Sequence, residues 1–201
     1  MSTELSPAER FARAKQRGRT PELDLFRRDQ RFDLDDFQQA ACVALEQGRS
    51  VLVAAPTGAG KTIVAEFGVH LTMRHPTDKI FYTTPIKALS NQKFNEFVRT
   101  YGASEVGLLT GDTNVNPQAR IVVMTTEVLR NMLYAGSDLL RDLRFVVMDE
   151  VHYLADRFRG AVWEEVIIHL PSDVRMISSA RPCRTRRSSA TGCRRCAATP
   201  M

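Results

Sequence analysis

Residues 51–62 read V-L-V-A-A-P-T-G-A-G-K-T, and this stretch decides the fold. The apolar run from Val51 to Val53 predicts a buried strand, and the glycine-containing segment after it predicts a loop that leads into a helix. Such a loop wraps an anion with backbone N–H groups, while the helix directs the positive end of its dipole at the same anion. We therefore expect a phosphate-binding loop here.

The residue types in this loop suit a nucleotide with Mg²⁺. Gly58 and Gly60 allow the backbone to approach the ligand closely. Lys61 can reach the β and γ phosphates, and the Thr62 hydroxyl can ligate Mg²⁺. Ala55 stands where the G-x-x-x-x-G-K-[ST] pattern usually has its first glycine, and a turn without any ligand is the alternative that the strand-to-helix context disfavours. The predicted contacts to ATP come from Thr57, Gly58, Ala59, Gly60, Lys61 and Thr62.

Length and composition indicate one soluble domain. The chain has 201 residues, with 43% hydrophobic and 25% charged residues, which is typical of a globular protein. Its uncharged apolar runs are too short to span a bilayer, and residues 1–10 lack the apolar run of a secretory signal. We expect a cytoplasmic protein without a membrane partner.

The net charge of +5 says nothing about the partners of the domain. Residues 181–201 contain six arginines and no acidic residue, and the rest of the chain has 22 basic and 23 acidic residues. The excess of positive charge therefore belongs to the tail alone.

Helices and strands are predicted to alternate from residue 32 to residue 180, which defines the expected domain. Apolar periodicity predicts helices at 37–48, 61–73, 86–101, 127–134 and 161–170, and strands at 51–53, 79–84, 106–109, 121–124, 145–148 and 174–177. Thr126 is expected to cap the fourth of these helices. The alternation implies an α/β fold, with a mostly parallel sheet covered by helices on both faces and ligands at the carboxyl ends of the strands.

The two ends of the chain differ from this pattern. Residues 1–31 are polar, with eight basic and five acidic residues, and predict a loosely held arm with a helical stretch at 8–16. A solvated charged surface explains this arm more simply than nucleic-acid binding does. Residues 181–201 contain no Ile, Leu, Val, Phe, Tyr or Trp, so we expect them to be disordered.

A second chemical motif, D-E-V-H, begins at Asp149, 88 positions after Lys61 and directly after an apolar run. A carboxylate at the end of a buried strand can hold the Mg²⁺ that bridges the phosphates, and a neighbouring carboxylate can orient the attacking water. Asp149 suits the first role and Glu150 the second. An acidic pair can also lie on a solvated surface, but its position after V-V-M and downstream of G-K-T favours the catalytic interpretation.

Six blocks occur in a fixed order: F-D-L-D-D-F-Q, A-P-T-G-A-G-K-T, T-T-P-I-K-A-L-S-N-Q-K, G-L-L-T-G-D, M-T-T-E-V-L-R and D-E-V-H. With them, residues 32–180 resemble the first lobe of a superfamily 2 DExH helicase, in the superkiller-like branch of RNA helicases and their bacterial HelY-type relatives. The resemblance implies a RecA-like domain of an ATP-dependent helicase, which hydrolyses ATP with Mg²⁺ and contacts the backbone of RNA or DNA. The matching residues do not distinguish RNA from DNA.

The resemblance also implies roles for residues outside the phosphate loop. Gln38, with Phe32 before it, matches the element that recognises adenine, and the alternative is an exposed glutamine beside a core phenylalanine. His152 is implied to couple nucleotide state to nucleic acid, although a structural histidine explains it nearly as well. Blocks that line the nucleic-acid track contain Pro85, Lys87, Thr110, Gly111, Thr125 and Thr126, for which turn and capping roles are the alternative.

The resemblance fails after Ala180. The family's Ser-Ala-Thr block is half present, because Ser179 and Ala180 are followed by Arg181. We therefore expect a truncated first lobe with a non-native tail, inactive by itself. Another phosphate-loop ATPase and a non-catalytic nucleotide-binding fragment are the alternatives.

The cysteines do not predict a metal site. Cys183, Cys193 and Cys196 lie in the tail, which offers no fourth zinc ligand, so no zinc is expected. Cys42 lies on the apolar face of a predicted helix and is expected in the core.

Overall fold

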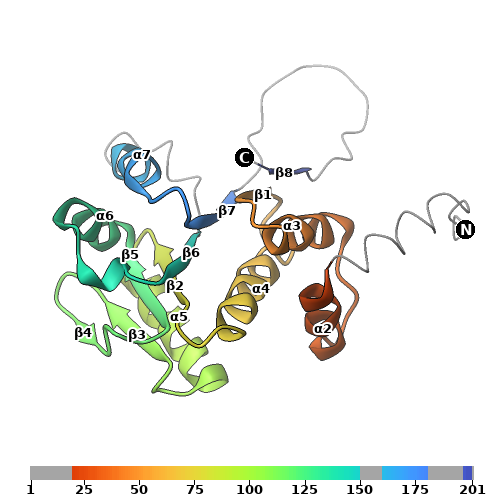
Figure 1. Ribbon diagram of the computed structural model, residues 1–201, viewed down its shortest axis with the longest axis horizontal. Helices are drawn as coiled ribbons and strands as arrows, with labels where there is room; N and C mark the ends of the chain where they lie inside the picture. The colour runs from red at the N-terminus through yellow and green to blue at the C-terminus, as the bar shows by residue number, and fades with distance from the viewer. Residues whose placement is uncertain (1–19, 150–159, 181–196, 201) are drawn as a thin grey trace, which may run out of the picture.

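The computed structural model describes residues 20–149, 160–180 and 197–200 (Figure 1). Its sheet has eight strands in the order β4-β3-β5-β2-β6-β7-β1-β8. The inner strands are all parallel, while β4 and β8 run antiparallel at the two edges. The strands are β1 (Val51–Ala54), β2 (Lys79–Thr84), β3 (Val106–Leu109), β4 (Asn114–Val115), β5 (Ile121–Thr125), β6 (Leu143–Met148), β7 (Arg175–Ala180) and β8 (Ala197–Pro200).

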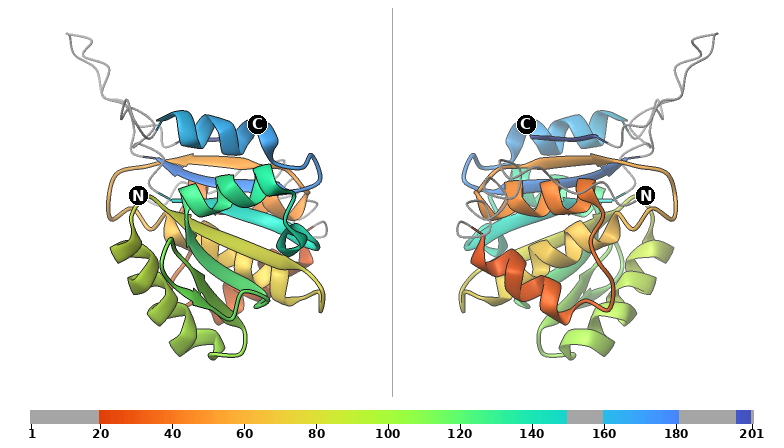
Figure 2. Two further views of the ribbon diagram at one scale, coloured as in Figure 1. Left: turned by 90° about the vertical axis from the view of Figure 1, so that its left-hand side faces the viewer. Right: turned by 90° about the vertical axis from the view of Figure 1, so that its right-hand side faces the viewer.

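Helices cover both faces of this sheet, and the predicted mostly parallel α/β fold is confirmed (Figures 1 and 2). One face packs against α3, α4 and α5, with α2 packed on α3 and α4, and the other face packs against α6 and α7, which contact each other. A 3-10 helix, Asp138–Leu140, leads into β6. The α-helices are α2 (Pro21–Asp29), α3 (Asp36–Glu46), α4 (Thr62–Met73), α5 (Lys87–Tyr101), α6 (Thr126–Ala135) and α7 (Gly160–His169).

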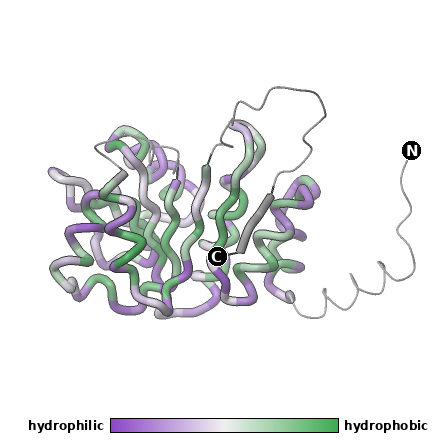
Figure 3. The backbone as a smooth tube through the Cα atoms, turned by 90° about the horizontal axis from the view of Figure 1, so that it is seen from above, coloured by the Kyte–Doolittle hydropathy of each residue, from purple (hydrophilic) through white to green (hydrophobic). Residues whose placement is uncertain are grey.

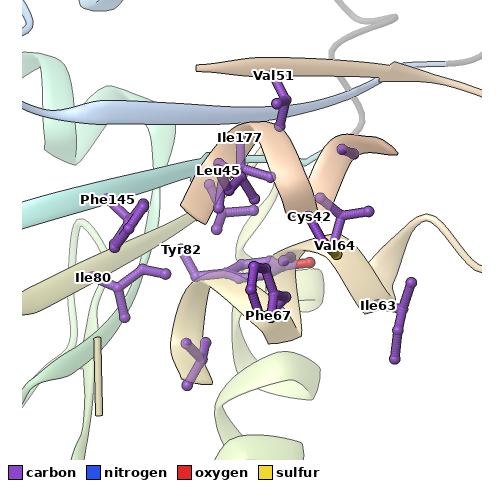
Figure 4. Close-up of a cluster of buried hydrophobic side chains, with 14 of the residues drawn as sticks. Cys42, Leu45, Val51, Ile63, Val64, Phe67, Ile80, Tyr82, Phe145 and Ile177 are labelled. Carbon is purple, nitrogen blue, oxygen red and sulfur yellow. The ribbon is translucent and has the colours of Figure 1, made fainter. Parts of the chain in front are cut away.

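The core consists of one hydrophobic cluster on each face of the sheet. The larger cluster contains Phe67 of α4, Tyr82 of β2 and Phe97 of α5, and Figure 4 shows part of it. The smaller cluster gathers around Trp163 of α7 and Met124 of β5. Hydrophobic residues follow the central strands, and hydrophilic ones lie mainly in the outer loops (Figure 3). Because the inner strands are buried on both faces, their sequences read as short continuous apolar runs.

Helix α2 differs from the predicted polar arm. Leu23 and Phe26 are buried in the larger cluster, and the Phe26 ring meets the Phe67 ring edge to face at 5.2 Å. The Glu46 carboxylate accepts hydrogen bonds from the backbone N–H groups of Glu22 and Leu23, at 2.9 Å each, and so caps the first turn of the helix. The expectation of a loosely held arm is therefore wrong for residues 20–29, while the stretch at 8–16 lies outside the described residues.

Of the tail, residues 181–201, the structure describes only residues 197–200. These residues form β8, antiparallel to β1, with Ala54 opposite Ala197 and Val51 opposite Pro200. Strand pairing uses backbone N–H and C=O groups, so it does not require the large apolar side chains on which the expectation of disorder was based. Residues 181–196 and Met201 lie outside the described residues.

Two further details concern helix ends and membranes. The N-cap of α6 is Thr125, and the Thr126 hydroxyl donates to the Thr84 carbonyl at 3.3 Å, so the predicted cap at Thr126 is wrong.

Within the described ranges, no helix has the length and apolar character needed to cross a membrane.

Candidate nucleotide and nucleic-acid site

Because the inner strands are parallel, their carboxyl ends lie along one side of the sheet, which we call the carboxyl edge. Of the residues predicted to bind nucleotide, the phosphate loop follows β1 and Asp149 follows β6, while Phe32 and Gln38 precede β1. Those predicted to contact nucleic acid lie at or just after the ends of β2, β3 and β5. In the strand order β3-β5-β2-β6-β7-β1, these two groups occupy separate halves of the edge. We call them the nucleotide half and the nucleic-acid half, and they meet between β2 and β6.

The phosphate loop leaves β1 at this edge and enters α4. Gly58 and Gly60 have φ angles of 82° and 69°, in the left-handed region that favours glycine. Ala55 has no positive φ, is buried, and donates its N–H to the Ala180 carbonyl at 3.2 Å. An alanine is therefore compatible with the position where the motif usually has glycine, and it ties the loop to β7.

The Lys61 side chain folds back over the loop. Its ammonium group donates to the Ala55 carbonyl at 2.7 Å and to the Pro56 carbonyl at 3.1 Å. Thr62 begins α4 and is exposed. The loop thus places one ammonium group, one exposed hydroxyl-bearing side chain and the N-terminus of a twelve-residue helix together, which suits a phosphate group.

Gln38 joins α3 to the phosphate loop. Its side-chain oxygen accepts a hydrogen bond from the Asp35 N–H at 2.8 Å, and its Nε2 donates to the Gly60 carbonyl at 3.0 Å. Gln38 is only 4% exposed, whereas Phe32 is 57% exposed. The alternative of an exposed glutamine beside a core phenylalanine is therefore wrong, and the adenine contact stays a prediction.

Asp149 follows β6, and both of its carboxylate oxygens accept hydrogen bonds. The Tyr82 hydroxyl donates to Oδ2 at 2.8 Å, and the Ser179 hydroxyl donates to Oδ1. Burial of the Tyr82 ring, followed by the charge of Asp149, raises the pKa of this hydroxyl well above its ordinary value, so it remains a donor. A carboxylate and the Thr62 hydroxyl offer the oxygen ligands that Mg²⁺ prefers, so the residues fit this ion.

Tyr82 and Ser179 were not predicted as site residues. Ser179 had a signal, because it belongs to the half-present Ser-Ala-Thr block at the end of a predicted strand. Tyr82 had none, because it is one apolar-type residue within the strand 79–84. Its contact with Asp149 spans 67 positions and depends on the register of β2 against β6.

In the nucleic-acid half, the structure brings three predicted residues together. Lys87 at the start of α5 forms an ion pair with Asp112, whose other oxygen accepts a hydrogen bond from the Thr110 hydroxyl at 3.0 Å. The hydrogen bond from Lys87, and then that from Thr110, lowers the pKa of Asp112. Gly111 lies between these partners and is exposed. The loop after β3 and the start of α5 therefore form one polar surface.

The remaining predicted contacts lie at the ends of β2 and β5 and are buried or half-buried, as Thr110 is at 8% exposed. Thr126 is 1% exposed, and its hydroxyl holds the end of β2 to the start of α6. Pro85 is buried and Thr125 is half-buried. For these three residues, nucleic-acid contact stays a prediction.

Several predicted roles fall on residues that the structure does not describe: those of Glu150, His152, Cys183, Cys193 and Cys196. Cys42 is fully buried, as expected, and burial raises the pKa of its thiol. Among the described ranges, no three His, Cys, Asp or Glu side chains gather as a metal-binding group.

Comparison with known proteins decides the family. A family model described as DEAD/DEAH box helicase matches residues 35–191. The chain belongs to this family. A probable helicase HelY of Mycobacterium tuberculosis (strain CDC 1551 / Oshkosh) is 64% identical over 157 residues, which are 78% of this chain and 17% of that protein. The antiviral helicase SKI2 of Saccharomyces cerevisiae is 57% identical over 146 residues, which are 73% of this chain and 11% of that protein.

Solved helicase structures share the fold of this DEAD/DEAH box chain. A crystal structure of the DUF1998 helicase MrfA bound to DNA has a TM-score of 0.64 at 20% identity, over 80% of this chain and 26% of that one. A second one, bound to DNA and AMPPNP, has a TM-score of 0.61 at 22% identity, over 74% and 24% of the two chains. At these identities the likeness shows the fold alone, and the chain spans less than a fifth of the length of the HelY and SKI2 relatives.

Proposed function

We propose that this chain acts as the ATP-binding lobe of an ATP-dependent helicase that moves along RNA or DNA. The observation that supports this most is the linkage of the phosphate loop to Asp149 across β7. Ser179 donates to Asp149, Val53 of β1 pairs with Ser179, and Ala55 at the start of the loop donates to Ala180. Lys61, proposed to bind the phosphates, and Asp149, proposed to bind the metal, are thus linked to each other through β1 and β7.

Each residue of the nucleotide half has a role in this proposal. Lys61 exchanges the carbonyls of Ala55 and Pro56 for phosphate oxygens, which bear more negative charge and make stronger hydrogen bonds. Thr62 and Asp149 hold Mg²⁺, which, when bound, offsets charge on the β and γ phosphates. Glu150 orients the attacking water. The backbone of residues 57–60 surrounds the phosphates, and Gln38 and Phe32 contact the adenine.

The nucleic-acid half offers contacts to the phosphate backbone. Lys87, Thr110 and Gly111 supply an ammonium group, a hydroxyl and the backbone of an exposed glycine, at the carboxyl ends of β2 and β3. Such contacts position a strand without reading its sequence. The MrfA structures are described as bound to DNA, and another relative is named an ATP-dependent RNA helicase, so either nucleic acid suits this surface.

A calorimetric titration of the 201-residue chain with ADP and excess Mg²⁺ tests the nucleotide site. Lys61→Ala is expected to weaken binding about 10- to 100-fold, because a hydrogen bond to a charged group contributes about 1.5–3 kcal/mol. Lys79→Ala is the matched control, since Lys79 begins β2 at the opposite edge of the sheet and its ammonium group donates to the Gln118 side chain there. Equal affinity of the parent and Lys61→Ala would remove the basis for the site.

A further inference from the structure

Where the nucleotide half and the nucleic-acid half meet, the Tyr82 hydroxyl of β2 donates a hydrogen bond to the carboxylate of Asp149, which follows β6. We propose that Tyr82 is a positioning residue, whose hydroxyl sets the rotation of the Asp149 carboxylate so that it can hold the Mg²⁺ of the nucleotide. This inference rests on the proposed role of Asp149 as a metal-binding residue. It adds a residue that belongs to no phosphate-binding motif.

The register of the strands explains why the two groups meet. Tyr82 lies opposite Val147, Thr83 lies opposite Met148, and Asp149 continues the ladder by donating its N–H to the Thr83 carbonyl at 3.2 Å. Tyr82 is therefore close enough to reach forward along β2 to the carboxylate. Because Ser179 reaches the other oxygen from β7, the carboxylate is held from both neighbouring strands.

The Tyr82 ring itself is held on several sides, so its hydroxyl has one place to point. The residue is 1% exposed and lies among the apolar side chains of the larger cluster (Figure 4). The Phe97 ring packs edge to face against it, with centroids 5.4 Å apart, and the Lys93 ammonium lies 5.6 Å from its centroid. Because the Tyr82 hydroxyl is already immobile, it can hold the Asp149 carboxylate in one rotamer. Metal binding then does not have to order the Tyr82 side chain.

A cavity of about 160 Å³ gives Asp149 access to solvent while Tyr82 stays buried. Its walls include Tyr82, Asp149 and, from α5, Lys93 and Glu96. Lys93 and Glu96 pair with each other at 2.8 Å. The space is large enough for several water molecules, which a Mg²⁺ ion usually retains when it binds with nucleotide.

A purely structural role is the competing explanation, because a buried tyrosine hydroxyl usually finds a hydrogen-bond partner. The two roles predict different results for Tyr82→Phe, which removes the hydroxyl and keeps the ring. A structural hydroxyl would change only the unfolding temperature. A positioning hydroxyl would also change the Mg²⁺ concentration at which ADP binds tightly.

The experiment is a calorimetric titration of the 201-residue chain with ADP over a series of Mg²⁺ concentrations, with a melting curve for each variant. For Tyr82→Phe we expect the Mg²⁺ midpoint to rise about tenfold or more, as for loss of other partners of metal-binding side chains, with ADP affinity in EDTA unchanged. Tyr101→Phe is the matched control. It loses a hydroxyl from a ring that also contacts Phe97, at 5.9 Å, and should keep the parent midpoint.

Asp149→Asn separates failure of this inference from failure of the proposed function. If Asp149→Asn abolishes the Mg²⁺ dependence while Tyr82→Phe keeps the parent midpoint, Tyr82 has no positioning role and the metal site stands. If Asp149→Asn keeps the parent dependence, both assignments are wrong. Should Tyr82→Phe not fold, Phe97→Leu loosens the ring without touching Asp149 and should raise the midpoint by a smaller factor. An unchanged midpoint in that variant overturns the inference.

Discussion

The two halves of the carboxyl edge are built differently. In the nucleotide half, Lys61, Gln38 and Asp149 are each held by partners that are backbone groups or buried side chains. In the nucleic-acid half, the main contact is the ion pair of Lys87 with Asp112, whose side chains are 46% and 65% exposed. The first half has its geometry fixed by packing, whereas the second is held by charges that a phosphate backbone could replace. Substitutions should therefore have large effects in the first half and small, salt-dependent effects in the second.

The largest effect is expected for Gly60→Ala. At a φ of 69°, an L-residue costs about 1–2 kcal/mol, and the new Cβ would lie 2.6 Å from the Gln38 Nε2. The loop or Gln38 must then move, and we expect ADP affinity to fall about 100-fold or more, since each 1.4 kcal/mol is a factor of ten. Calorimetry with Mg²⁺ measures the loss.

Gly58→Ala is the matched control, because its φ of 82° imposes a similar strain but its Cβ would meet nothing within 4 Å. We expect it to cost about tenfold in affinity, from the backbone strain alone. If the two alanine variants lost the same affinity, the contact between Gln38 and the loop would not contribute to the rigidity of the nucleotide half.

An intermediate effect is expected for Gln38→Ala, which removes the hydrogen bonds to Asp35 and Gly60. Each net hydrogen bond contributes about 0.5–1.5 kcal/mol, so the unfolding free energy should fall by about 1–3 kcal/mol in a urea titration. Gln39→Ala, at the next position of α3, has no such side-chain contact in the described structure and should stay near the parent value.

Gln38→Glu separates the effects of the two Gln38 hydrogen bonds. A carboxylate still accepts from the Asp35 N–H but cannot donate to the Gly60 carbonyl. This variant should keep the hydrogen bond from the Asp35 N–H at the start of α3 while losing nucleotide affinity. A variant with parent affinity would show that the link to the loop is not needed for binding.

Much of the fold was predictable because local patterns decided it. Strand β2 begins and ends where the sequence predicts, at Lys79 and Thr84, since its apolar run stops at Pro85. Helix α2 was missed because only Leu23 and Phe26 mark its buried face within a charged segment. Its first turn is capped by Glu46, which lies more than twenty positions away and cannot be recognised locally.

The same distinction applies to the candidate site. The phosphate loop and Asp149 follow from short motifs, since each needs only a strand and the residues after it. The partners of Asp149, Tyr82 and Ser179, depend on which strands are neighbours and in what register. Asp112 stands within a recognised block, but its pairing with Lys87 requires β3 and α5 to be side by side.

The smallest effect is expected for Asp112→Asn, which tests how the nucleic-acid half uses its charges. The Asn oxygen can still accept from the Thr110 hydroxyl, so the loop keeps this contact, but Lys87 loses its counter-charge. Exposed ion pairs are weak, and Lys87 should therefore exchange Asp112 for a phosphate at little cost. We expect binding of single-stranded RNA or DNA to tighten by no more than about fivefold at low salt, with a salt dependence steeper by up to about 0.7 in log–log slope.

Asp138→Asn is the control for this last comparison. It also removes one negative charge from an exposed pair, that of Asp138 with Arg141 at 2.9 Å, but it lies before β6 at the opposite edge of the sheet. If both variants tighten binding equally, the effect comes from net charge and not from Lys87. If Asp112→Asn instead weakens binding, Asp112 holds Lys87 in the orientation that meets a phosphate, and the nucleic-acid half is then preorganised by an ion pair as the nucleotide half is by packing.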